Sequence, residues 1–191
     1  MNDEMFLVLN AVYLRKIATS EVVRECTGLS PEAIRAALDA AGAEGSVEDL
    51  GGQFMLNDEG TAAVRAAYDE RYAPLRAEAD VEAWYQRFES LNSQFLKTIS
   101  AWQTGGDEGQ LDKLLKLVER QIKALGTISA TVPRYAGYGD RFERALSLVE
   151  EGKTEFVTSP TLDSIHNVWF EFHEDILTLL GRPRDVAEGN G

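Results

Sequence analysis

The stretch SPEAIRAALDAAGAEGSVEDLGGQFMLNDEG, residues 30–60, carries the pattern of a helix followed by a hairpin. Ser30 supplies a capping hydroxyl and Pro31 takes the first helical position, which predicts a helix that runs to about Ala41. Its apolar residues recur at helical spacing, so Arg35 falls on the outward face. Glycines follow, and the segment VEDLGGQFML predicts two short strands around a Gly-Gly turn.

The segments on either side of this stretch predict further helices. Residues 4–17 are apolar enough for a largely buried helix, although a short strand is compatible with the same pattern. Thr19 or Ser20 caps the next helix, and Asn57 starts one that ends before Pro74. This order is typical of a winged helix-turn-helix domain, whose recognition helix is the one capped at the start of the quoted stretch. A small helical domain with a hairpin is the alternative.

The charge of this region argues against DNA binding. Between Ala36 and Val64 there is no lysine or arginine, and there are six acidic residues: Asp39, Glu44, Glu48, Asp49, Asp58 and Glu59. A winged-helix DNA reader gains much of its affinity from basic side chains set against phosphates. Here only Arg35 is placed for a base or a phosphate. The pattern therefore favours docking to a protein partner, with DNA binding through Arg35 as the alternative.

The composition indicates a soluble, acidic protein. The 191-residue chain has a formal net charge of −13 and 44% hydrophobic residues, which is enough for two small cores. Residues 1–75 hold 6 basic and 13 acidic residues, and residues 76–191 hold 13 and 19, so no basic tail or stripe stands out. No run approaches the ~20 apolar residues of a membrane span, and there is no secretory signal. With Cys26 as a single buried thiol, these features predict a cytoplasmic protein that binds no membrane. Nucleic acid is a less favoured partner than protein and stays the alternative.

After Pro74 the pattern becomes almost wholly helical. Apolar residues at steps of three and four define four helices, over about 76–102, 110–130, 140–150 and 161–180. Short links between such helices predict an antiparallel bundle. The predicted fold is therefore mainly α, with a winged-helix-like domain at 1–74, a four-helix bundle at 75–181 and a flexible tail at 182–191.

Both histidines of the chain lie in the last of these helices. A helical projection places His166 and His173 within about 60° of the centre of the apolar stripe. Buried histidines are usually satisfied core residues, and the alternative is a polar pocket for a small aromatic or phosphorylated ligand. In such a pocket a histidine donates a hydrogen bond or moves a proton. The candidate ligand-binding residues are Asp163, His166, Trp169, Phe170, His173, Trp102, Tyr135 and Tyr138.

Asp163 and His166 have the carboxylate-x-x-His spacing of metalloproteins built on helical bundles. No second pair of this kind occurs on another helix, and the projection turns Glu171 and Asp175 away from the apolar stripe. We therefore predict no metal site and no cofactor. The segment RYAGYGD (134–140) has no strand before it and no lysine after it, so it is interpreted as a turn into the next helix rather than a phosphate loop.

Three segments carry a family resemblance: FESLNSQFLKTISAWQ (88–103), RYAGYGDRFERALSLVEEG (134–152) and TLDSIHNVWFEFHEDILTLLGR (161–182). They resemble small actinobacterial proteins in which a winged-helix-like region precedes a helical domain. Members of that family are often labelled as transcriptional regulators and are associated with enzymes of the phosphoenolpyruvate synthase and pyruvate phosphate dikinase type. The resemblance covers nearly the whole chain.

The resemblance implies an accessory subunit of an ATP-dependent phosphotransferase that acts on a small organic substrate. A catalytic role within that enzyme is not expected, since the chain has neither a glycine-rich Thr-x-His loop nor room for a separate ATP domain. The leading hypothesis is a non-catalytic subunit that docks its partner and holds a ligand in the helical domain. The alternative is a winged-helix transcriptional regulator with a ligand-sensing helical domain. A third hypothesis is an independent enzyme that uses His166 and His173.

Overall fold

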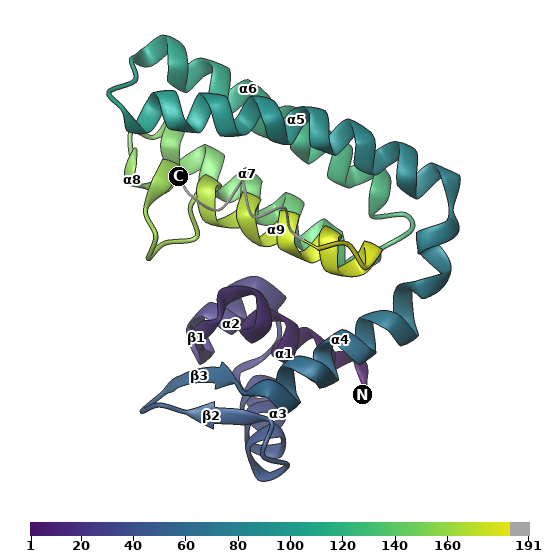
Figure 1. Cartoon of the computed structure of the whole chain (residues 1–191). Helices are drawn as coiled ribbons and strands as arrows, with labels where there is room; N and C mark the ends of the chain where they lie inside the picture. Colours follow the sequence, from purple (N-terminus) through teal and green to yellow (C-terminus); the bar gives the residue numbers. More distant parts are fainter. Residues whose placement is uncertain (184–191) are drawn as a thin grey trace. The chain divides into compact units, whose positions relative to one another are not determined.

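The computed structural model describes residues 1–183 and confirms the predicted mainly helical fold. It also contains a small three-stranded sheet. These residues form two compact units (Figure 1). The N-terminal unit comprises Met1–Pro74 and Glu174–Pro183, and the helical unit comprises Leu75–His173. Most of the tail predicted at residues 182–191 lies outside the described residues.

The N-terminal unit combines four helices with the sheet. Its helices are α1 (Asp3–Arg15), α2 (Ser20–Thr27), α3 (Pro31–Ala43) and α4 (Asp58–Tyr72). Its strands are β1 (Ile17–Thr19), β2 (Val47–Asp49) and β3 (Gln53–Leu56), in the order β1-β3-β2 with both pairings antiparallel. The predicted caps are in place, because Thr19, Ser30 and Asn57 each accept a hydrogen bond from a backbone N–H of the helix that follows.

The faces of α3 agree with the periodicity of the sequence. Ile34, Ala37 and Leu38 are buried, and Arg35 is exposed. The sequence did not predict β1, which is only three residues long and is defined by its pairing with β3. Lys16, at φ 67°, ends α1 in the left-handed region and leads the chain into this strand.

The helical unit holds three long helices and the first part of a fourth. They are α5 (Ala79–Gln103), α6 (Glu108–Ile128), α7 (Ala136–Glu150) and α9 (Ile165–Leu180). Shorter pieces join them: η1 (Ala73–Ala77), η2 (Pro133–Tyr135) and α8 (Glu155–Thr158). Helix α6 packs against both α5 and α7, and Figure 1 shows α7 and α9 side by side.

Two boundaries in this unit differ from the predictions. The segment RYAGYGD was interpreted as a turn, but α7 begins at Ala136 and takes in both of its glycines. The last helix was expected from Thr161, but it begins at Ile165 because the Ser164 hydroxyl accepts a hydrogen bond from the Asn167 N–H at 3.3 Å. Within the described residues, no helix is long and apolar enough to cross a membrane.

Candidate functional site

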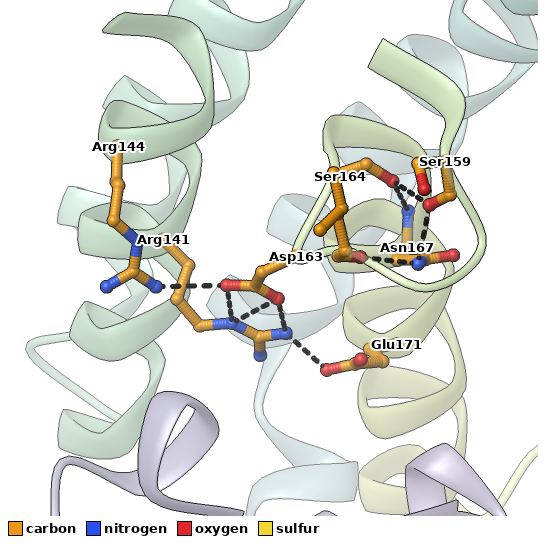
Figure 2. A network of polar contacts seen from close by, with 8 residues as sticks. Arg141, Arg144, Ser159, Asp163, Ser164, Asn167 and Glu171 are labelled. Atoms are coloured by element: carbon orange, nitrogen blue, oxygen red, sulfur yellow. Dashed lines mark hydrogen bonds and ion pairs between the residues drawn. The ribbon is translucent and has the colours of Figure 1, made fainter. Parts of the chain in front are cut away.

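Two guanidinium groups and two carboxylates meet between α7 and the start of α9 (Figure 2). Arg141 donates from Nε to both oxygens of Asp163, at 3.2 and 3.0 Å, and from Nη2 to Oδ1 at 2.6 Å. The same Nη2 donates to Oε2 of Glu171 at 2.6 Å. Arg144 donates to Oδ2 of Asp163 at 3.0 Å. The four groups therefore balance their charges through direct hydrogen bonds.

Burial makes this network costly to disturb. The side chains of Arg141, Asp163 and Glu171 are only 5%, 7% and 7% exposed, whereas that of Arg144 is 52% exposed. A buried ion pair recovers its desolvation cost only when its geometry is good and its remaining polar atoms are hydrogen-bonded. The bidentate contact from Arg141 to Asp163 provides the good geometry. Arg141 is the central group, because it contacts both carboxylates.

The loop before α9 holds Asp163 in position. Asn167 donates from Nδ2 to the carbonyl oxygens of Ser159, at 3.0 Å, and Leu162, at 2.7 Å. The Ser164 hydroxyl also donates to the Ser159 carbonyl, at 2.9 Å. These bonds close residues 159–164 onto the first turn of α9, as Figure 2 shows. The loop that carries Asp163 is thus held in place by Ser164 and Asn167.

Of the predicted site residues, the two histidines lie in different surroundings. His173 is buried, with Nε2 3.2 Å from Oε1 of Glu89. His166 is only partly buried and rests on Phe170, with ring centroids 4.5 Å apart. Burial lowers the pKa of His166 below its ordinary value, and a hydrogen bond with Asn167 partly offsets the shift. His166 is therefore neutral at physiological pH and able to donate or accept a hydrogen bond.

The predicted aromatic residues pack mostly into the core. Trp169 donates from Nε1 to Oδ1 of Asn92 at 3.0 Å and stacks on Phe95, with ring centroids 4.0 Å apart. Tyr135 and Tyr138 are buried and meet Phe172 edge to face at 5.1 and 5.2 Å. These rings contribute hydrophobic burial and edge-to-face contacts to the helical unit.

Trp102 is at the C-terminal end of α5 and is partly exposed. The turn after the helix folds back on it, and the Gly106 N–H donates to its carbonyl oxygen at 3.1 Å. A Cβ at Gly106 would lie 2.7 Å from the Trp102 Cα. The glycine is thus needed for this close approach.

The sequence missed the partners of Asp163 and misplaced two acids. Glu171 and Asp175 were expected to face away from the core, but they are 6% and 0% exposed. Glu171 is buried against Arg141, and Asp175 accepts a hydrogen bond from Nδ2 of Asn10 at 3.4 Å. Periodicity could not reveal these polar partners on other helices. One indication was available, because Arg141 falls at an inward position of its helix, three residues after Tyr138.

The described residues offer little for metal binding. Within residues 1–183, no group of three or more His, Cys, Asp or Glu side chains is arranged to hold an ion. Both oxygens of Asp163 accept hydrogen bonds from arginine, so a cation there would have to displace a guanidinium. Comparison with known protein families, curated proteins and solved structures finds no match for this chain.

The lowered pKa of His166 predicts a pH dependence of stability. Below the ordinary histidine pKa of about 6.5, the unfolded chain binds a proton at this residue more readily than the folded chain does. The free energy of unfolding should therefore fall as the pH drops through that range. We expect urea unfolding at about pH 5.5 and pH 7.5 to show a smaller drop in His166→Gln than in the wild type. An equal drop in the two proteins would contradict this assignment.

Proposed function

We propose that this chain is a non-catalytic accessory subunit whose N-terminal unit docks a protein partner. One observation carries the proposal: the six acids of the basic-free segment are all exposed, on α3 and the turn after it, on the hairpin and at the start of α4. They are Asp39, Glu44, Glu48, Asp49, Asp58 and Glu59. Leu50 sits among them beside the hairpin turn and is 52% exposed. An acidic surface with an exposed apolar tip suits a basic protein surface better than it suits DNA.

We assign the N-terminal unit to the winged helix-turn-helix type. The order of its elements supports this assignment: a helix, a short strand, two helices and a hairpin whose second strand pairs with the short strand. In this assignment α3 is the recognition helix and β2 with β3 is the wing. We assign α5, α6, α7 and α9 to an antiparallel four-helix bundle.

We propose that the chain is not catalytic because of the side-chain contacts in its helical unit. Two of the groups that could serve as acids or bases are engaged with a neighbouring side chain, Asp163 with Arg141 and His173 with Glu89. The family resemblance makes an enzyme of the phosphoenolpyruvate-utilising type the proposed partner, in the cytoplasm. Any ligand held near His166 would then change the affinity of the chain for this partner.

A charge-reversal variant tests the docking surface. Asp39→Lys, Glu44→Lys and Glu48→Lys change three exposed acids with no role in the hairpin turn. Asp49 is left in place because its Oδ1 accepts a hydrogen bond from the Gly52 N–H at 2.7 Å. We expect the triple variant to bind the partner roughly tenfold or more weakly, with most of the loss at low salt. Binding is measured with the partner recovered by affinity capture.

The matched control reverses three exposed acids of α7: Asp140→Lys, Glu143→Lys and Glu150→Lys. It changes the net charge by the same amount at another surface. Equal weakening in both variants would show that total charge, rather than this surface, governs binding, and would contradict the proposal.

The regulator alternative retains one favourable observation, the exposure of Arg35 on α3. This alternative requires that the chain retard genomic DNA in an electrophoretic mobility-shift assay, that salt weaken this binding, and that Arg35→Ala abolish it. A shift with these properties would replace docking by DNA binding as the function of the N-terminal unit.

A further inference from the structure

A groove with a cationic lining runs between α5 and α6, which lie side by side in Figure 1. Its volume is about 350 Å³. Four basic side chains line it, Lys97 from α5 and Lys113, Lys116 and Arg120 from α6. Gln94 and the largely buried Leu117 also line it. The groove lies in the helical unit and shares no residue with the Asp163 network.

The lining is exclusively basic among charged residues, in a chain with a net charge of −13. Across residues 1–183 no carboxylate lies within ion-pair distance of any of these four cations. Arg120 instead donates from Nη1 to Oε1 of Gln94, at 3.3 Å, which links the two helices across the groove. Four like charges that line one groove without an ion pair to a described carboxylate repel one another, so an anion in the groove would relieve that repulsion.

Helical spacing explains why this basic cluster is not apparent from the sequence. Lys113, Lys116 and Arg120 recur at steps of three and four, so they share one face of α6 over roughly 10 Å. Asp112 and Glu119, which lie four residues before and three residues after Lys116, border the same face of α6, but neither of them lines the groove. The basic surface is therefore assembled by the fold and not by a run of basic residues.

We propose that this groove binds a compact polyphosphate, such as tripolyphosphate or the diphosphate group of an organic molecule. The volume is in the range of small-molecule sites. Three cations over roughly 10 Å of α6, with Lys97 of α5 lining the same groove, match the charge of two or three linked phosphates. An extended nucleic acid fits less well, because it would also approach the acidic remainder of the chain. The apolar side chain of Leu117 gives the organic part of a ligand a surface to rest on.

Calorimetric titration of the full chain with tripolyphosphate tests the proposal, at fixed ionic strength. We expect saturable binding, and a rise of several degrees in the unfolding temperature, because a ligand that binds only the folded state stabilises it. Lys113→Gln with Lys116→Gln is expected to weaken binding tenfold or more. Both side chains are exposed and make no ion pair within residues 1–183, and their removal lessens the repulsion among the four cations, so the urea midpoint without ligand should not fall.

A second pair, Lys97→Gln with Arg120→Gln, repeats the test with one residue from each helix. The matched control is Lys123→Gln, an exposed cation of α6 outside the groove lining, which should bind as the wild type does. Tighter binding of a nucleoside diphosphate than of pyrophosphate would identify an organic ligand, and the reverse order an inorganic one. No saturable binding, equal weakening in Lys123→Gln, or binding of a single-stranded oligonucleotide alone would overturn the proposal.

Discussion

Arg141→Met is expected to lower the free energy of unfolding of the helical unit by about 3–5 kcal/mol, which is the usual cost of leaving a buried charge without its partner. The variant would leave two carboxylates whose side chains are each 7% exposed, with Arg144 as the remaining cation on Asp163. The three tryptophans, Trp84, Trp102 and Trp169, all lie in the helical unit, so their fluorescence follows its unfolding in urea. The urea midpoint should fall sharply.

Two controls separate the charge effect from loss of packing. Arg144→Met removes a guanidinium that is 52% exposed, and it should cost no more than about 1 kcal/mol. Adding Asp163→Asn and Glu171→Gln to Arg141→Met removes the uncompensated charges and should recover part of the loss. If Arg141→Met and Arg144→Met cost the same, the buried network would not be the feature that stabilises this unit.

Gly60→Ala is the second substitution with a large expected effect, about 2–3 kcal/mol of destabilisation in the N-terminal unit. A Cβ at this buried position of α4 would lie 2.1 Å from the backbone oxygen of Ser46. Ser46 cannot move easily, since its N–H and hydroxyl both donate to the Ala41 carbonyl, at 2.9 and 3.0 Å. Urea unfolding followed by far-ultraviolet circular dichroism measures the change.

Gly126→Ala supplies the matched comparison in α6. A Cβ there meets nothing within 4 Å, so the substitution should stabilise the helix by roughly 0.5–1 kcal/mol. The two glycine substitutions should therefore have opposite signs. A stabilising Gly60→Ala would mean that the hairpin and α4 are not packed as described.

The local part of the fold could be predicted because its causes are local. Capping side chains, proline at the first helical position and a Gly-Gly turn act within a few residues, and they located α2, α3, α4 and the hairpin. The inward and outward faces of α3 followed from periodicity alone.

Features that depend on distant partners could not be predicted. Strand β1 exists through its pairing with β3, and Glu171 is buried because Arg141 lies on another helix. The same limit applies to the basic groove, whose cations come from α5 and α6 and alternate in sequence with acids. Of the candidate site, the sequence identified Asp163 but not the arginines that hold it.

Affinity capture of the tagged chain from its native cells is the most direct test of the proposed docking to a protein partner. The capture is done at moderate salt, with mass spectrometry to quantify each recovered protein. We expect near-stoichiometric recovery of one enzyme of the phosphoenolpyruvate-utilising type. Recovery of the chain without any protein partner would contradict it.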